Sequence, residues 1–171
     1  MKRDVRQVQI EGDLAFVPLT RGYVAVIDAA DAEIVGQHNW MAFVMTGRNM
    51  VYASTNIGGR KNHRTVLMHR LIAGEPKGLQ VDHRDGDGLN NRRENLRAAT
   101  HADNQRNSRT PVTNSSGFKG VSLCNGGPKW QARISVDNIT RYLGVFETKE
   151  EAAEAYMKAA QRLHGEFANP G

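Results

Sequence analysis

The segment from Val81 to Arg109 contains side chains whose types and spacing fit hydrolytic chemistry. Asp82 and His83 are adjacent, and asparagines follow the histidine after twelve and twenty-one residues, at Asn95 and Asn104. A carboxylate and an amide oxygen are hard ligands, which suit Mg²⁺ or a similar divalent ion that keeps waters and binds phosphate. A histidine beside such a ligand can take a proton from an attacking water at neutral pH. The set predicts metal-assisted hydrolysis of a phosphodiester.

Positive charge is concentrated around this segment. Residues 60–120 carry twelve Lys and Arg against six Asp and Glu, whereas residues 1–59 carry five against six and residues 121–171 carry six against six. A cationic band of this kind is typical of a protein with a polyanionic partner. A merely soluble basic surface would give the same count, so charge alone leaves both interpretations open.

Local patterns indicate the elements that must position these side chains. LQVDH and NLRAAT predict short strands on either side of the turn-rich loop RDGDGLNN, and Thr100 with Asp103 forms a capping box for a helix over residues 101–108. This order would bring Asp82, His83 and the first helical turn to face one another. Upstream, TVLMHRLIAG predicts a helix or a buried strand, and the first 62 residues predict short strands, with one short helix in DAADAEIVGQHNW.

The pattern changes after RTPVTNSSG, which has no periodicity and predicts a linker. Apolar and polar residues then alternate from Trp130 to Val136, which predicts a half-buried strand, and TRYLGVF predicts its partner. Thr148 and Glu151 form a capping box at the start of a helix with one apolar face. Residues 117–171 therefore predict a three-stranded antiparallel sheet with one helix packed across it.

The letters VDHRDGDGLNNRRENLRAATHADNQRNS resemble the HNH nuclease motif, in the phage homing-endonuclease form where an asparagine replaces the last histidine. The resemblance implies that Asp82 and Asn104 bind the metal, Mg²⁺ or another divalent ion such as Mn²⁺. It also implies that His83 is the general base and that Asn95 ties the loop and orients the base. The upstream LMHRLIAG looks like the segment that precedes the motif, which leaves His69 as support for the active site or as a structural residue.

Each of these residues also has a structural interpretation. Asp82 fits a surface turn, His83 a satisfied polar side chain, and the pair Asn90 and Asn91 fits turn formation. The order of the whole set favours the nuclease. Arginines in and after the motif are then expected to contact phosphates without reading sequence: Arg92, Arg93, Arg97, Arg106 and Arg109.

A second resemblance covers residues 117–169. GFKGVS, KWQARI, YLGVFETKEEAAEAY and AAQRLHGEFAN look like the AP2/ERF DNA-binding domain of plant transcription factors, which is also found fused to HNH nucleases. It implies a sheet that enters the major groove of double-stranded DNA while the helix braces its back. Ser122, Cys124 and Ser135 stand where the plant pattern has arginines, which argues against a plant-type GC-rich target. A module that binds protein is the alternative, supported by the balanced charge. The implied DNA contacts are Lys119, Gln131, Arg133 and Tyr142.

These patterns predict an α+β chain: an N-terminal β-rich scaffold (1–62), a ββα-metal HNH nuclease (63–108), a linker (109–116) and an AP2-like domain with a three-stranded antiparallel sheet and one helix (117–171). The expected activity is site-specific endonuclease cleavage that nicks DNA, by a monomer with one divalent metal. The rival is a transcriptional regulator that binds DNA through the AP2-like domain and does not cut, with a relic HNH region. An RNA-binding module would need clustered aromatic residues, and a structural protein is the weakest alternative.

Composition also predicts the compartment. Cys124 is the only cysteine, so no intrachain disulfide is expected, which suits a reducing compartment. MKRDVRQVQIEGD has charges without an apolar core behind them, and no apolar run approaches the ~18 residues of a membrane span. We therefore expect neither a signal peptide nor a membrane partner, and a cytoplasmic location in a phage-infected or bacterial host cell.

Overall fold

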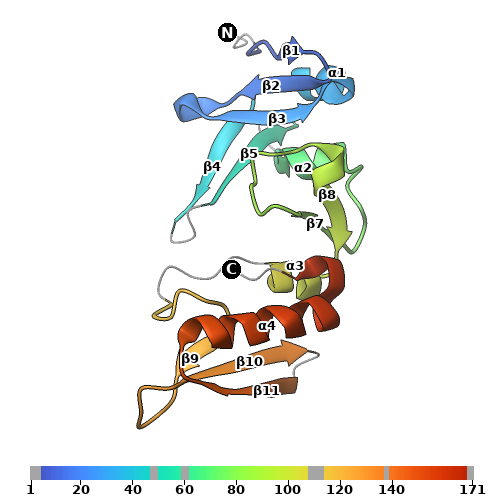
Figure 1. The fold of residues 1–171 in the computed structure, drawn as a ribbon. Coiled ribbons are helices and arrows are strands. Elements are labelled where there is room, and N and C mark those ends of the chain that lie inside the picture. Colours follow the sequence, from blue (N-terminus) through green and yellow to red (C-terminus); the bar gives the residue numbers. More distant parts are fainter. Residues whose placement is uncertain (1–4, 47–49, 59–61, 108–113, 137–138, 169–171) are drawn as a thin grey trace. The chain divides into compact units, whose positions relative to one another are not determined.

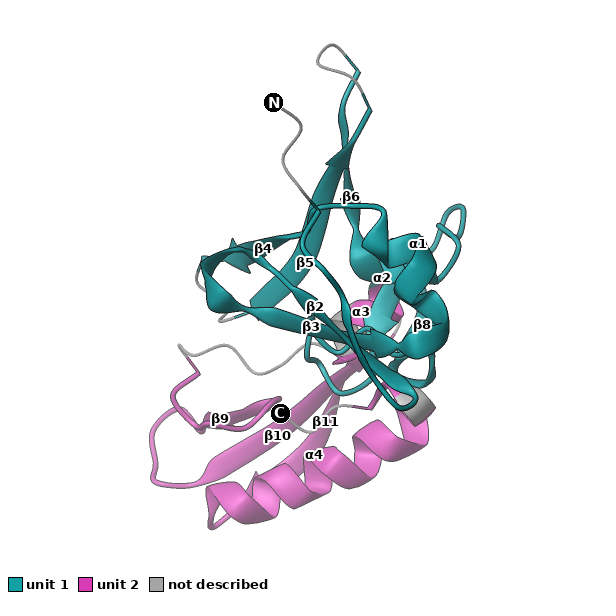
Figure 2. Ribbon diagram, turned by 90° about the horizontal axis from the view of Figure 1, so that it is seen from above, with its two compact units in different colours: residues 1–101 teal, residues 102–171 magenta. Residues whose placement is uncertain are grey.

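The computed structural model describes residues 5–46, 50–58, 62–107, 114–136 and 139–168. The chain divides into two compact units, which we call the N-terminal unit (Met1–His101) and the C-terminal unit (Ala102–Gly171) (Figure 2). Both consist of small antiparallel sheets and few helices, which confirms the predicted mixture of helices and strands (Figure 1). The predicted linker begins later than this division, and its residues 109–113 lie outside the described residues.

The N-terminal unit contains three sheets, each of which runs in chain order. The first two are three-stranded, and the third is a two-stranded ribbon. Strands β4 and β5 pair in antiparallel fashion, and residues 47–49 between them lie outside the described part of the chain. The elements are β1 (Gln9–Glu11), β2 (Leu14–Pro18), η1 (Thr20–Gly22), β3 (Val24–Asp28), η2 (Ala29–Asp31), α1 (Ala32–Gly36), β4 (Met41–Met45), β5 (Met50–Ile57), β6 (Arg64–Leu67), α2 (Met68–Ile72), β7 (Gln80–His83), η3 (Arg93–Asn95) and β8 (Leu96–Ala99).

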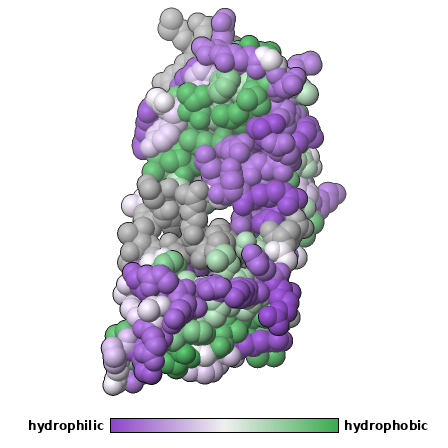
Figure 3. Space-filling view, viewed as in Figure 1, coloured by the Kyte–Doolittle hydropathy of each residue, from purple (hydrophilic) through white to green (hydrophobic). Residues whose placement is uncertain are grey.

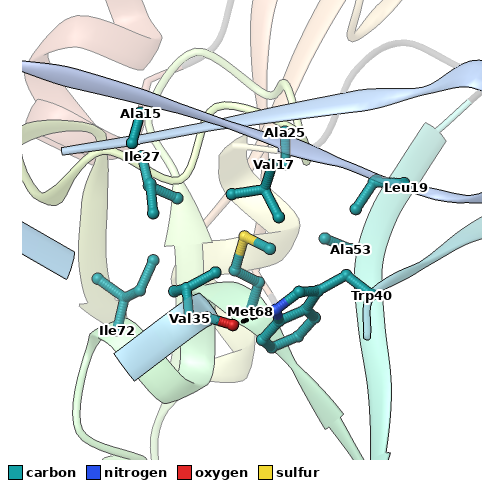
Figure 4. Close-up of a cluster of buried hydrophobic side chains, with 10 residues drawn as sticks. All are labelled: Ala15, Val17, Leu19, Ala25, Ile27, Val35, Trp40, Ala53, Met68 and Ile72. Carbon is teal, nitrogen blue, oxygen red and sulfur yellow. Dashed lines mark hydrogen bonds between the residues drawn. The ribbon is translucent and has the colours of Figure 1, made fainter. Parts of the chain in front are cut away.

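The core of this unit forms because alternate residues of β2 and β3 point inward. Ala15 and Val17 of β2 meet Ala25 and Ile27 of β3, and side chains from α1, β5 and α2 close the cluster (Figure 4). Trp40 is 1% exposed, and its indole Nε1 donates a hydrogen bond to the carbonyl of Val35 at 2.9 Å, so its polar atom is satisfied. On the outside, apolar side chains of β3 and β4 remain exposed, visible as the green area of this unit in Figure 3.

The segment TVLMHRLIAG resolves into both of the predicted alternatives. Its first part is β6, which pairs with β5 through Val66 opposite Thr55. Its second part is α2, where Met68, His69 and Ile72 are buried. An apolar run has no periodicity that separates strand from helix, so the pairing with β5 determines where the strand ends.

The C-terminal unit begins with α3 (His101–Asn107, whose first residue still belongs to the N-terminal unit) and continues as a sheet of order β11-β10-β9 with one long helix. The predicted alternation is confirmed, since Ala132 and Ile134 are 0% and 2% exposed whereas Arg133 and Ser135 are exposed. The predicted capping box of Thr148 is also present. The elements are β9 (Val121–Leu123), β10 (Trp130–Val136), β11 (Ile139–Phe146), α4 (Lys149–His164) and η4 (Gly165–Phe167).

Helix α4 packs its small and aromatic residues on the sheet, with Ala152, Tyr156 and Ala160 buried. Gly120 explains how closely they approach: a Cβ at this position would overlap the ring of Tyr156 and the carbonyl of Arg133. Among the described residues, no helix has the length and apolar character required to span a membrane.

Candidate functional site

Strands β7 and β8 hold the predicted catalytic pair. They are antiparallel, with Asp82 opposite Arg97 and His83 opposite Leu96. Successive residues of a strand point to opposite faces, so the neighbours Asp82 and His83 have different environments. Both are buried, at 6% and 4% exposure, which is unusual for a carboxylate and requires a partner.

That partner is Arg97. Its Nε and Nη2 both donate to Oδ2 of Asp82, at 2.9 and 2.8 Å, and the two side chains are only 5% and 7% exposed. The structure therefore places Arg97 in a buried ion pair and not on the surface, where a phosphate contact would need it. The pair holds the carboxylate of Asp82 in one orientation.

His83 is held by Asn91, which the sequence predicts only as a turn former. Nε2 of His83 lies 3.3 Å from Oδ1 of Asn91, which is fully buried. Nδ2 of Asn91 donates to the carbonyls of Leu89 and Gly88, at 3.0 and 3.5 Å, so the amide must present its oxygen to the ring. The hydrogen-bond network therefore assigns the proton of a neutral imidazole to Nε2 and the lone pair to Nδ1.

Asn95 ties the loop between the strands. Its Oδ1 accepts from the backbone N–H of Asp85 at 3.1 Å, and its Nδ2 donates to Oδ1 of Asp85 at 2.9 Å and to the carbonyl of Asn90 at 2.8 Å. These bonds join the two ends of the loop. Nε2 of His83 donates to Oδ1 of Asn91, so Asn91 acts on the ring whereas these bonds of Asn95 act on the loop.

The N-terminal sheet extends into this loop. The N–H of Val26 in β3 donates to the carbonyl of Leu89 at 2.9 Å, and the N–H of Asn91 donates to the carbonyl of Val26 at 2.7 Å. The backbone of Asn90 thus lies beside β3 as a parallel bridge. The strand that precedes the motif by more than fifty residues fixes the position of the asparagine that contacts His83.

Two carboxylates, one in the last residue of β3 and one shortly after it, strengthen this attachment. Asp31 accepts from Nε and Nη2 of Arg93 at 2.9 and 2.6 Å, and its own side chain is 3% exposed. Asp28 accepts from Nε of Arg92 at 3.2 Å and from the backbone N–H of Arg93 at 2.8 Å. Two of the arginines expected to contact phosphates therefore have partners within the protein, although the side chain of Arg93 remains 61% exposed.

The surroundings of His83 favour its neutral form. Burial lowers the pKa of His83, while the hydrogen bond to Asn91 and the carboxylates of Asp82, Asp85 and Asp87 oppose this shift. A general base must be unprotonated to accept a proton. The surroundings of His83 therefore favour the unprotonated imidazole that the predicted general base requires.

His69, whose role the sequence leaves open, lies against His83. Its ring meets that of His83 edge to face, with centroids 4.8 Å apart. Burial, with smaller effects from His83 and Arg70, lowers the pKa of His69 to about 3. His69 is thus a neutral neighbour of His83.

The remaining residues predicted for the nuclease lie on or after α3. Asn104 is half-buried on this helix, and Arg106 is on the same helix, whereas Arg109 lies outside the described residues. Within the described ranges, no group of three or more His, Cys, Asp or Glu side chains could hold a metal ion.

The motif implies only two metal ligands from the protein, Asp82 and Asn104, which is fewer than the three side chains of such a group. One carboxylate with one amide suits an ion such as Mg²⁺ that keeps several waters. An ionised carboxylate has about four lone-pair positions, so a carboxylate that accepts from Arg97 at Oδ2 can also bind a metal ion. The chemistry of Asp82 fits a divalent ion.

The C-terminal unit brings together three of the four side chains predicted to contact DNA. Gln131, Arg133 and Tyr142, with Thr140, line a shallow open depression on the sheet. Nη2 of Arg133 donates to Oε1 of Gln131 at 2.9 Å, and Tyr142 is 59% exposed. The fourth, Lys119, is half-buried and does not line this depression, and burial lowers its pKa.

Comparisons with known proteins identify the family. The family model described as HNH endonuclease matches residues 63–106, which contain β6, α2, β7 and β8. A protein of Acanthamoeba polyphaga mimivirus named as an uncharacterized HNH endonuclease is 30% identical over 150 residues, which are 88% of this chain and 75% of that protein. Protein 3.8 of Escherichia phage T7 is 34% identical over 93 residues, which are 54% of this chain and 76% of that protein.

A plant protein matches a shorter part of the chain. An AP2-like ethylene-responsive transcription factor of Arabidopsis thaliana is 46% identical over 50 residues, which are 28% of this chain and 9% of that protein. The mimivirus protein, in contrast, is similar over three quarters of its length, and the HNH model covers the strands that carry Asp82 and His83. This chain therefore belongs to the HNH endonuclease family.

Proposed function

We propose that this HNH endonuclease nicks DNA with His83 as the general base and that the sheet of its C-terminal unit directs it to a sequence. The observation that carries the proposal is the state of His83, which is buried, neutral and bound through Nε2 to Asn91. With the proton on Nε2, Nδ1 carries the lone pair of the neutral imidazole, and we propose that it accepts the proton of a water. Positioned bases of this kind contribute roughly 10²- to 10⁴-fold to a rate.

The other residues of the site prepare this step. Asp82 and Asn104 would hold the divalent ion, Mg²⁺ or Mn²⁺, which when bound stabilises charge on the phosphoryl group and on the leaving oxygen. Arg97 orients the carboxylate of Asp82. Asn95 closes the loop that carries Asn91, and the carbonyl oxygen of the Asn91 amide stabilises the proton on Nε2 when the imidazole becomes charged.

The C-terminal unit would supply recognition as the AP2-like domain. Its row of Gln131, Arg133 and Tyr142, which line an open depression on the sheet, would face a major groove. Gln131 holds the guanidinium of Arg133 in place, and arginine paired with guanine is the commonest specific contact in that groove. Lys119, Arg106 and Arg109 would then contact phosphates, and residues 109–116 would connect nuclease and reader.

One nuclease finger holds one active site, so a monomer on DNA would cut one strand. The relatives in phage T7 and mimivirus support action on DNA in the cytoplasm of an infected host cell. The similarity to a plant transcription factor is the observation that favours the rival, a DNA-binding regulator that does not cut.

The test is a supercoiled-plasmid assay with Mg²⁺, Mn²⁺ or EDTA, extended to pooled phage and host DNA. Metal-dependent nicked product from the wild type, absent in His83→Ala while DNA binding is retained, is the expected result. Arg133→Ala should keep the chemistry and lose the sequence preference. Double-strand breaks from a demonstrated monomer would refute nicking. DNA retarded in a gel but uncut under all conditions would establish the regulator.

A further inference from the structure

Three rings from three elements of the N-terminal unit meet at the general base. Tyr52 of β5 lies with its ring centroid 5.6 Å from that of His69 in α2 and 5.8 Å from that of His83 in β7. The two histidine rings are 4.8 Å apart with planes at 81°. Such edge-to-face contacts favour one orientation of a ring over others. Tyr52 and His69 therefore both lie against the His83 imidazole.

The ring of Tyr52 also touches the loop that carries Asn91. A Cβ added at Gly88 would lie 2.6 Å from Cδ1 of Tyr52 and would overlap the carbonyl oxygen of Val51. The glycine backbone is thus in direct contact with β5. Because the carbonyl of Gly88 accepts a hydrogen bond from Asn91, one aromatic ring contacts both the base and the turn that orients the base.

His69 completes this contact as an uncharged filler. It is 5% exposed, and in the described part of the chain its Nδ1 is buried without a hydrogen-bond partner. A neutral imidazole whose buried nitrogen bonds to nothing acts through its shape. The burial of such an unpaired polar atom costs free energy. A phenyl ring at this position has no polar atom, so its burial would not carry this cost.

We propose that Tyr52 and His69 are positioning residues: their rings hold His83 and the Gly88–Asn91 turn in the arrangement that keeps the proton on Nε2 and the lone pair on Nδ1. The inference rests on the proposed role of His83 as the base. It adds two residues that lie outside the loop and act through His83 and its turn.

The first test is the single-turnover cleavage rate of the full chain at saturating protein, with DNA affinity measured separately in EDTA. Tyr52→Ala should slow cleavage by about 10- to 100-fold, since a misplacement of about 1 Å has effects of this size. DNA affinity should not change. Tyr52→Phe and His69→Phe should both stay near the wild-type rate, because ring shape is retained. A wild-type rate in Tyr52→Ala, or His69→Phe as slow as His69→Ala, would overturn the proposal.

A control and a second measurement separate positioning from stability and from the enzyme assignment. Val35→Ala removes a fully buried side chain of the core outside the three-ring cluster, so it should lower the melting temperature and leave the rate unchanged. Long-range ¹H–¹⁵N spectra of His83 without metal should show the Nε2–H tautomer in the wild type and a mixture in Tyr52→Ala. If Tyr52→Ala shows the mixture of tautomers but the wild type does not cut DNA, the proposed function is contradicted and the positioning role is not. Unchanged spectra and rates in Tyr52→Ala, in a protein that cuts, would refute the positioning role only.

Discussion

Replacement of Arg97 by methionine distinguishes a phosphate contact from a buried ion pair. Methionine keeps the length of the side chain and removes the charge, so Asp82 loses both hydrogen bonds from the guanidinium. The two side chains are 5% and 7% exposed, so water cannot replace the lost partner. Removal of one member of a buried pair costs about 3–5 kcal/mol, whereas a change at an exposed arginine stays within about 0.5 kcal/mol.

The expected shift in melting temperature follows from the size of the unit. A loss of 1 kcal/mol lowers the melting temperature of a domain of ~60–100 residues by roughly 4–8 °C. For the unit Met1–His101, Arg97→Met should therefore lower the melting temperature by about 12 °C or more. The slope of DNA affinity against salt should not change, because a phosphate contact would contribute about 0.9 to that slope and a buried pair contributes none.

Circular dichroism melts and DNA binding across a salt series measure the two quantities on the same protein. Arg133→Met is the matched control, since it removes an exposed arginine from a sheet surface and should leave the melting temperature unchanged. Asp82→Asn combined with Arg97→Met should be more stable than Arg97→Met alone, because no buried charge remains. The assignment of Arg97 to Asp82 is wrong if Arg97→Met melts within about 2 °C of the wild type and reduces the slope of DNA affinity against salt by about 0.9, the value for one phosphate contact.

Three further predictions concern the stability in acid, the carboxylate of Asp31 and the N-terminal cap of α4. The pKa of His69 is lowered from 6.5 to about 3, so the unfolded chain takes up the proton first. The free energy of unfolding should then fall by roughly 2–3 kcal/mol between pH 7 and pH 4.5 relative to His69→Phe; parallel urea-unfolding results for the two proteins would contradict this. Asp31→Ala releases Arg93 and loosens the loop, so cleavage should slow more than DNA binding weakens, and an equal loss of both would instead favour a direct role of Arg93 on DNA. Thr148→Ala removes the capping box of α4 and should cost about 1 kcal/mol, measured by hydrogen exchange in α4, where unchanged protection would show that the cap contributes nothing.

Much of the fold follows from local patterns. The alternation from Trp130 to Val136 and the capping box at Thr148 predict β10 and the start of α4, because periodicity and capping depend on neighbours in the chain. The segment TVLMHRLIAG cannot be assigned in this way. Its division into β6 and α2 depends on pairing with β5, a contact between distant parts of the chain.

The motif itself is also a local pattern, and it predicts Asp82, His83 and Asn95 as a set. It does not distinguish Asn91 from a turn former or Tyr52 from an ordinary strand residue, because their contacts with His83 join different elements. No local pattern links Asp28 and Asp31 to the motif. They meet Arg92 and Arg93 across more than sixty residues of sequence.

The sequence by itself determined the chemical types present: an acid–histidine pair, a series of amides, and an excess of arginine in the middle third. Only the tertiary structure decided what those groups do. Arg97 pairs with Asp82 because β8 places it opposite, out of water, and Asn91 reaches His83 because β3 holds its turn. The charge of a side chain is a property of the residue, whereas its burial and its partner are properties of the fold, and these determine whether a guanidinium binds a phosphate or a carboxylate.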